Sequence, residues 1–380
     1  MRTWIDIDLD ALIANYRTAC GLTGARVTCV LKANAYGHGA VAVASCLSGA
    51  GCDAFAVSCG REALELRRAG IPGEILVMTP AEPDELPALL QNRVVLTAAS
   101  LHDLEEADRA ARDTGCAATV HIKLDTGFHR LGFPCQQDAA RALATALSGT
   151  RGVRAVGLYS HLSLVSRELD QRQHRRFVQM AGWLEEAGLD LPDRHLCDSI
   201  GMVRYPDWHM SRVRVGAFLY GVRPSGSDDL PFSCAETAAL RAKVTSVVTV
   251  PAGETVGYDE ALTDHPVRVA TIQAGYGDGY PRCLSNGKGQ VLIRGKRAPV
   301  LGLVCMDQLM ADVSGIRDCA PGDTATLLGG GIGYGEMADW AGTNRNECLT
   351  LLSRRPVRVY HRAGQADERR DSLLDKEDTE

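Results

Sequence analysis

The chain has 380 residues, of which 45% are hydrophobic, and a net charge of −6. That length can bury one large core or two moderate ones, and the absence of a basic block argues against a nucleic-acid partner. No apolar stretch is long enough to cross a membrane and no signal peptide precedes the first segment, so we expect no membrane span and a cytoplasmic protein. The 13 cysteines lack CxxC or metal-like spacing, which favours reduced thiols and predicts no metal site.

Alternating apolar and acidic residues open the chain and predict a strand over residues 1–8, which we expect to pack on a C-terminal domain. Eight short apolar segments then alternate with helical segments. The predicted strands cover residues 27–31, 54–57, 75–78, 94–96, 118–124, 153–159, 194–197 and 212–215, and helices are predicted over 61–69, 101–114, 138–147 and 171–187. This α/β alternation favours an N-terminal (β/α)8 TIM-like barrel over residues 9–228.

The alternation ends near residues 224–231, PSGSDDLP, and a turn-rich sequence follows. Strands are predicted over residues 242–250, 267–273, 290–293, 298–303, 307–313 and 324–328. These segments predict a C-terminal, mostly β domain over residues 229–366. Residues 367–380 are dense in charge and predict a disordered tail.

Lys32 lies where the first of the eight strands ends, in the sequence VTCVLKANAYGHGA of residues 27–40. A lysine at the end of a buried strand is costly unless its ammonium group is paired or neutral. One interpretation is an amine that forms a Schiff base, and the other is a side chain that extends to water. Gly37 and Gly39 end the loop after Lys32, and a helix is predicted from Ala40.

Polar side chains also follow other predicted strands. They are Lys123, Asp125 and Arg130 after the fifth, His161 after the sixth, Asp198, Ser199 and Gly201 after the seventh, and Arg214 and Gly216 around the eighth. Each has an ordinary explanation, such as a satisfied histidine, a surface ion pair or a helix start. Together they place polar groups on one face of a barrel, with backbone amides after strands seven and eight, where barrels often hold a phosphate. A Schiff-base lysine beside a phosphate site indicates pyridoxal 5'-phosphate (PLP).

Six motifs along the chain resemble those of the alanine racemase family, which comprises PLP enzymes of fold type III. They are VLKANAYGHGA, KLDTGFHRLGF, VRVGAFLYG, VGYDEALT, AGYGDGYPR and VCMDQLMADV, and they cover nearly the whole chain in order. The resemblance implies a PLP barrel, a C-terminal β domain and a homodimer whose active sites borrow residues from the partner. It also implies an isomerase that interconverts L- and D-alanine to supply D-amino acids for peptidoglycan.

The resemblance implies a role for each matching residue of the first domain. Lys32 would bind PLP and act as one catalytic base, Tyr36, Ser199 and Gly216 would contact the phosphate, and Arg214 would face the pyridine nitrogen. Arginine does not readily give up its proton. The ring nitrogen should therefore stay unprotonated, so that the cofactor is a weaker electron sink and proton exchange is favoured over side reactions.

The resemblance also implies a second base on the opposite face of the α-carbon, because a single base tends to return the proton to the side it left. Tyr258 would be this base, contributed by the other subunit, and His161 would orient it. Arg130 would lie near the phenolic oxygen of PLP, and Lys123 matches a lysine that is carbamylated in some members. Met306, also contributed across the interface, and Asp307 would meet the substrate carboxylate, and Tyr276 would line the access channel.

Three positions depart from the family pattern. Asp198 replaces the usual asparagine, and its charge is unfavourable beside a phosphate unless it is protonated, paired or turned away. His129 replaces a glycine, which could shift Arg130. Asn346 replaces a tyrosine that narrows the substrate pocket, and the added space and amide group resemble the serine racemases of the vancomycin-resistance type. Those proteins carry a membrane domain ahead of the catalytic part, so we expect this chain to be either a freestanding enzyme or a cytoplasmic fragment.

Two other functions stay open. The same barrel serves PLP-dependent amino-acid decarboxylases, against which Tyr258 and Arg214 argue. A non-catalytic PLP-binding protein is the second alternative, but it would leave Tyr258, Met306 and Asp307 without a purpose.

Overall fold

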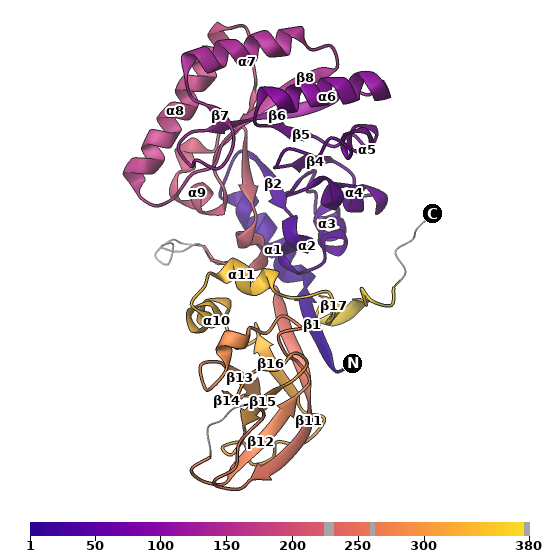
Figure 1. Cartoon of the computed structure of the whole chain (residues 1–380), viewed down its shortest axis with the longest axis vertical. Coiled ribbons are helices and arrows are strands. Elements are labelled where there is room, and N and C mark those ends of the chain that lie inside the picture. The colour runs from indigo at the N-terminus through magenta and orange to yellow at the C-terminus, as the bar shows by residue number, and fades with distance from the viewer. Residues whose placement is uncertain (224–231, 259–262, 376–380) are drawn as a thin grey trace.

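The computed structural model describes residues 1–223, 232–258 and 263–375, and it divides into an α/β part and a β part (Figure 1). The predicted linker at residues 224–231 lies outside the described residues. In the α/β part, helices surround strands that run parallel, and in the β part antiparallel strands form a twisted sheet. Within the described residues, no helix is both long and apolar enough to cross a membrane.

The α/β part contains two parallel sheets, with the strand orders β10-β2-β3-β4 and β5-β6-β8-β9. The strands are β2 (Arg26–Val30), β3 (Ala54–Val57), β4 (Glu74–Val77), β5 (Leu96–Ala98), β6 (Ala118–Asp125), β8 (Val153–Tyr159), β9 (Asp193–His195) and β10 (Arg212–Val215), and the short β7 (Phe133–Pro134) pairs with β6. A parallel bridge between Leu76 and Val95 joins β4 to the segment before β5. At the other edge, the amide of Ser211 donates to Arg194 O at 3.1 Å and that of Arg214 to Cys197 O at 3.0 Å. The two sheets are thus connected at both edges.

Helices connect these strands. They are α1 (Leu9–Gly21), α3 (Ala40–Gly49), α4 (Gly60–Arg68), α5 (Leu86–Gln91), α6 (Leu101–Thr114), α7 (Gln137–Gly149), α8 (Arg167–Glu186) and α9 (Ser199–Arg204), with 3-10 turns η1 (Pro206–Trp208) and η2 (Ala217–Tyr220). The start and end of α6 show why its sequence folds locally. The Ser100 side chain accepts a hydrogen bond from the amide of Asp103, and the Asp103 side chain accepts one from the amide of Ser100. Gly115 ends the helix in the left-handed conformation.

The β part contains a closed barrel. Its strands are β11 (Ala238–Val250), β12 (Val267–Ile272), β13 (Gln290–Ile293), β14 (Lys296–Leu301), β15 (Leu309–Asp312) and β16 (Thr324–Leu328). The sheet runs β12-β15-β14-β13-β16-β11, and a direct pairing of β11 with β12 closes it. η3 (Arg282–Leu284), α10 (Tyr334–Ala341) and α11 (Arg345–Thr350) complete this part, and α11 lies between the barrel and the α/β part (Figure 1).

The N-terminal strand joins the two parts. β1 (Thr3–Asp8) pairs antiparallel with β11 and parallel with β17 (Val357–Arg362), and α1 follows it directly. Alternate residues Ile5 and Ile7 are fully buried in the common core. The backbone therefore begins in the β part and crosses into the α/β part within its first ten residues.

The C-terminal residues correct one prediction. β18 (Gln365–Arg370) pairs antiparallel with β17, so residues 367–370, which we predicted to be disordered, form an edge strand. Charged side chains are compatible with this position because an edge strand faces water and charge discourages further pairing. Residues 376–380 of the predicted tail lie outside the described residues.

Candidate active site

A cavity of about 360 Å³ lies where the parallel strands end. It brings together eight of the residues predicted for the site, which are Lys32, Tyr36, Arg130, His161, Ser199, Arg214, Gly216 and Asn346. Lys123 and Asp198 line it as well. All but Asn346 come from the α/β part, and Asn346 reaches the cavity from α11 of the β part.

The backbone after Lys32 forms a left-handed turn, α2 (Lys32–Tyr36), where the sequence predicted a loop. Ala33, Asn34, Ala35 and Tyr36 have φ values between 52° and 55°. Non-glycine residues rarely adopt this conformation, so surrounding contacts must hold it. The amide of Ala40 donates to Asn34 Oδ1 at 2.8 Å, which ties the turn to the start of α3.

The β part supplies further contacts to this turn. Arg358 donates from Nε and Nη2 to Gly37 O, at 3.2 and 3.0 Å, and Tyr360 Oη donates to His38 O at 2.9 Å. Gly37 has no room for a side chain, because an added Cβ would lie 2.5 Å from Leu349 O of α11. The conformation beside Lys32 therefore depends on residues more than 300 positions away.

The surroundings of Lys32 lower the pKa of its amine. Burial lowers its pKa, and the positive charge of Arg130 lowers it further, whereas Glu62 and Asp198 act in the opposite direction. The side chain lines the cavity. This placement favours a reactive amine over a lysine that merely extends to water.

Arg214 is held in the cavity by four hydrogen bonds. Nη1 donates to His195 Nδ1 at 2.7 Å and to His195 O at 3.1 Å, while Nη2 donates to the carbonyls of Ser160 and Leu196 at 2.7 and 3.0 Å. The Nε–H is then the guanidinium donor that no described residue accepts. A ring nitrogen that accepts a hydrogen bond fits this free donor, which is how Arg214 would meet an unprotonated pyridine.

Ser199, Gly216 and Tyr36 form one wall of the cavity. The Gly216 amide donates to Ser199 Oγ at 3.0 Å, and a Cβ added at Gly216 would lie 2.7 Å from Tyr36 Oη. This wall therefore presents the hydroxyl groups of Ser199 and Tyr36 at a place where a side chain at position 216 would intrude. Such donors fit the phosphate of PLP.

Burial and neighbouring charges lower the pKa of two further basic side chains of the cavity. Burial lowers the pKa of Lys123 well below its ordinary value, and Arg214 and Arg130 lower it further. Burial also lowers the pKa of His161 well below its ordinary value, helped by the charges of Arg214 and Lys123. His161 packs beside Phe128, with ring centroids 5.2 Å apart. In the described chain, His161 and Tyr258 line different cavities.

The structure accounts for two of the three departures from the family pattern. Asp198 Oδ1 caps α9 by accepting the amides of Ile200 and Gly201, at 3.0 and 2.8 Å, and burial raises its pKa. His129 has φ 57°, a conformation that glycine adopts more readily, and its amide and Nδ1 bind Asp125 at 3.0 and 3.2 Å. Arg130 still lines the cavity, with its guanidinium 4.6 Å from the Phe128 ring centroid.

The other four predicted residues line a separate cavity of about 790 Å³, formed in the β part by Tyr258, Tyr276, Met306, Asp307 and neighbouring residues. Tyr258 is 78% exposed and Met306 53% exposed. Arg355 holds the adjoining segment, because it binds Asp278 through two hydrogen bonds of 3.0 Å and Asp307 through one of 2.7 Å. A single chain therefore does not bring Tyr258 to the cavity that contains Lys32.

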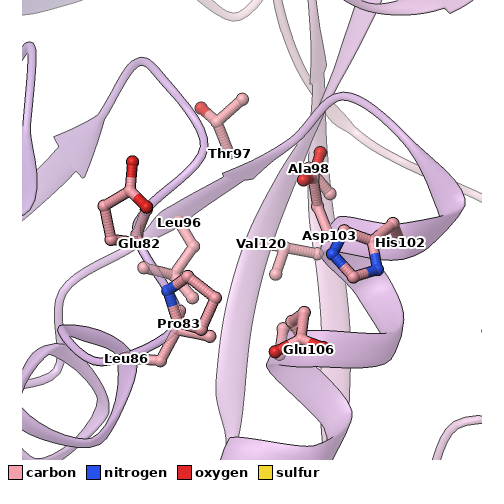
Figure 2. Close-up of a pocket in the computed structure, with 12 residues that line it drawn as sticks. Glu82, Pro83, Leu86, Leu96, Thr97, Ala98, His102, Asp103, Glu106 and Val120 are labelled. Carbon is pink, nitrogen blue, oxygen red and sulfur yellow. The ribbon is translucent and has the colours of Figure 1, made fainter.

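A third hollow, of about 210 Å³, lies between α5 and α6 and contains none of the predicted residues. Figure 2 shows Glu82 and Pro83 on one side of it and His102, Asp103 and Glu106 on the other. Asp103 already caps α6, and Glu106 pairs with Arg109. These contacts explain Asp103 and Glu106 as parts of the helix.

Two buried aromatic side chains near the cavity were missed by the sequence analysis. His195 accepts a hydrogen bond from Arg214, and Tyr159 stacks on His195 with ring centroids 4.8 Å apart. Tyr159 Oη also bonds to Thr97 Oγ1 at 2.7 Å and to Met78 O at 3.0 Å. Both residues lie in predicted strands, at residues 153–159 and 194–197, where only alternation along the strands could have identified them as inward-facing.

Comparison with known proteins identifies the same family in both parts of the chain. The family model for the N-terminal domain of alanine racemase matches residues 7–224, and that for the C-terminal domain matches residues 237–360. Alanine racemase of Desulforamulus reducens is 35% identical over 365 residues, which cover 94% of this chain and 98% of that protein.

Solved structures agree with this result. Alanine racemase of Clostridium difficile 630 superposes with a TM-score of 0.95 at 30% identity, covering 98% of this chain and 99% of the other. That of Bacillus anthracis with bound L-Ala-P gives a TM-score of 0.92 at 31% identity, covering 98% of each chain.

Proposed function

The chain belongs to the alanine racemase family of PLP-dependent enzymes, and from this premise we propose that it interconverts the L and D forms of alanine and of serine by exchange of the α-proton between two bases. The two parallel sheets would form the (β/α)8 barrel of that family. The D-amino acids would supply cell-wall peptidoglycan. The observation that carries the proposal is the cavity in which Lys32 lies among Arg130, Arg214 and Ser199.

PLP, when bound, withdraws electron density from the α-carbon of the amino acid and so makes its proton acidic. Lys32 would hold the cofactor and, once displaced by the substrate, accept or return the α-proton at its Nζ on one face. Its lowered pKa supports this role, since a base must be unprotonated to act. Arg214 would orient the ring nitrogen through its free Nε–H, and Ser199 and Gly216 would hold the phosphate.

Tyr258 would hold or move the proton on the opposite face. Because Tyr258 and Lys32 line different cavities of one chain, we propose a homodimer in which each subunit contributes Tyr258 and Met306 to the cavity of its partner. The high exposure of both side chains supports an interface at this surface. His161, kept neutral by burial, could then accept a hydrogen bond from the partner's Tyr258.

Asn346 is the basis for including serine as a substrate. It lines the same cavity as Lys32, where its amide offers a donor and an acceptor to a hydroxyl group on the substrate. An amide partner favours the hydroxyl-bearing substrate, and a larger tyrosine would fill the space. The position of Asn346 on α11 and the small volume of the cavity therefore support a small, hydroxyl-bearing amino acid as a substrate.

The experiment is a racemisation assay on each enantiomer of alanine and serine with PLP added. No racemisation of either amino acid by PLP-bound protein would refute the proposed function. Asn346→Tyr should lower the ratio of serine to alanine turnover roughly threefold to tenfold, which corresponds to one neutral hydrogen bond. Asn92→Tyr, made at the end of α5 and outside the cavity, is the matched control and should leave the ratio unchanged. An equal ratio in wild type and Asn346→Tyr would remove Asn346 as the source of specificity.

A further inference from the structure

A row of polar side chains runs through the α/β part, from half-buried carboxylates at the amino ends of the strands to the buried Arg214. Asp193 and Arg212 begin β9 and β10, and Glu74 begins β4. His121 lies midway along β6 and His195 ends β9. The two histidine rings are both completely buried, so their hydrogen bonds are made within the protein.

The direction of each hydrogen bond follows from Arg214, which can only donate. Its Nη1 lies 2.7 Å from His195 Nδ1, so this nitrogen must accept. A neutral His195 then carries its proton on Nε2 and donates to His121 Nδ1, 2.9 Å away. The proton of His121 is thereby placed on its Nε2, which has no hydrogen-bond partner within the described residues and lies 3.8 Å from Asp193 Oδ2.

The surroundings keep both rings neutral. Burial lowers the pKa of His195 well below its ordinary value, and the charge of Arg214 lowers it further. Burial and the charge of Arg212 lower the pKa of His121 to about 4, although Asp193 and Glu74 act in the opposite direction. A protonated His195 would carry a proton on Nδ1 and lose the bond from Arg214.

Shape constrains His121 as closely as charge does. A Cβ added at Gly157 of β8 would lie 2.6 Å from both Cε1 and Nδ1 of His121, so the glycine makes room for the ring. Glu74, His121 and Asp193 place ligand atoms within 4.8 Å of one another, as a metal site would. The guanidinium of Arg212 pairs with both carboxylates, however, and already supplies the positive charge there.

We propose that His121 is a positioning residue for the cofactor, which acts through His195 to fix the guanidinium that meets the pyridine nitrogen. The inference rests on the proposed role of Arg214. Because His121 keeps His195 from turning, Nη1 of Arg214 retains its hydrogen bond to His195 Nδ1. The Nε–H of Arg214 then stays directed toward the position of the ring nitrogen. Outer partners of this kind, one step removed from the bound group, orient the residues that touch it.

The test compares three variants with wild type. His121→Phe removes the acceptor for His195 and keeps a ring, whereas His121→Asn keeps an acceptor near the position of Nδ1. His174→Phe is the matched control, since His174 stacks on Trp208 away from this row, with centroids 4.3 Å apart. Circular dichroism and thermal unfolding select conditions in which all of them are folded.

Titration of each apoprotein with PLP, followed by the absorbance of the bound cofactor, should show about tenfold weaker binding for His121→Phe. His121→Asn and His174→Phe should bind as wild type does. Nitrogen-15 NMR of the imidazole groups in wild-type apoprotein should show His121 and His195 as neutral Nε2–H tautomers at neutral pH. Either ring in the Nδ1–H form, or wild-type PLP affinity in a folded His121→Phe, would overturn the proposal. Failure of wild type to bind PLP or to racemise would instead refute the proposed function, and the NMR result would be unaffected by it.

Discussion

Two inactive variants are expected to restore activity when they form one dimer. Lys32→Ala removes the base of one cavity and Tyr258→Phe removes the base of the other, so each homodimer should be inactive. If Tyr258 completes the partner's site, a hybrid of the two variants contains one site with both substitutions and one with neither. The physical ground is that Tyr258 is 78% exposed and lines a cavity separate from that of Lys32 in the same chain.

The expected activity follows from counting sites. Random exchange between equal amounts of two variants gives about half hybrid dimers, each with one intact site of two, and hence about a quarter of wild-type turnover. Hybrids isolated with two different affinity tags should reach about half of wild-type turnover. The assay is alanine racemisation after co-expression, with each variant alone as the control. An inactive hybrid, shown by its tags to contain both chains, would refute the shared site. If both bases of a site came from the same chain, each of the two sites in the hybrid would lack one base.

Three further predictions concern the wall of the cavity, a buried hydroxyl and an ion pair. Gly216→Ala should weaken PLP binding about tenfold in a titration, because its Cβ would lie 2.7 Å from Tyr36 Oη, whereas Gly182→Ala, with no atom within 4 Å, should not. Tyr280→Phe should raise the free energy of unfolding by up to about 1 kcal/mol in urea, since the buried hydroxyl has no partner among the described residues; a loss of stability would reveal one. Burial alone would raise the pKa of Glu74, but hydrogen bonds and charge from Arg212 lower this pKa below its ordinary value of 4.5. The ionised Glu74 therefore stabilises the fold above pH 4.5, and this contribution is lost as the pH falls through the lowered pKa. The stability difference between wild type and Glu74→Gln should therefore shrink in urea unfolding below about pH 4, and a difference that grows there would contradict this reasoning.

Local sequence patterns predicted much of the fold. The predicted bounds of β3, β8, β10 and α6 agree with the structure at both ends, because strand alternation, helix periodicity and the Ser100 cap act over a few residues. Eight of the predicted site residues meet in one cavity, since strand ends at one face converge in any parallel arrangement of this kind.

What the sequence could not predict depends on distant contacts. Alanines at positions 33 and 35 do not favour positive φ, and their left-handed turn is stabilised from the β part by Arg358 and Tyr360. Likewise, the charged residues of β18 gave no strand signal, and they become ordered because β17 offers a free edge. The sequence did not identify His195 because its hydrogen-bond partners, Arg214 and His121, lie on other strands.

The position of Asn346 separates specificity from acid–base chemistry in a testable way. Asn346 lies on α11 of the β part yet lines the cavity of its own chain, whereas Tyr258 of the same β part does not. In the hybrid dimer, the intact site uses Lys32 and Asn346 of the chain that carries Tyr258→Phe. Adding Asn346→Tyr to that chain should lower the ratio of serine to alanine turnover, and adding it to the Lys32→Ala chain should leave the ratio unchanged. If the ratio instead falls only when Asn346→Tyr is added to the Lys32→Ala chain, α11 serves the partner's site. The β part as a whole, and not only the surface around Tyr258, would then act across the interface.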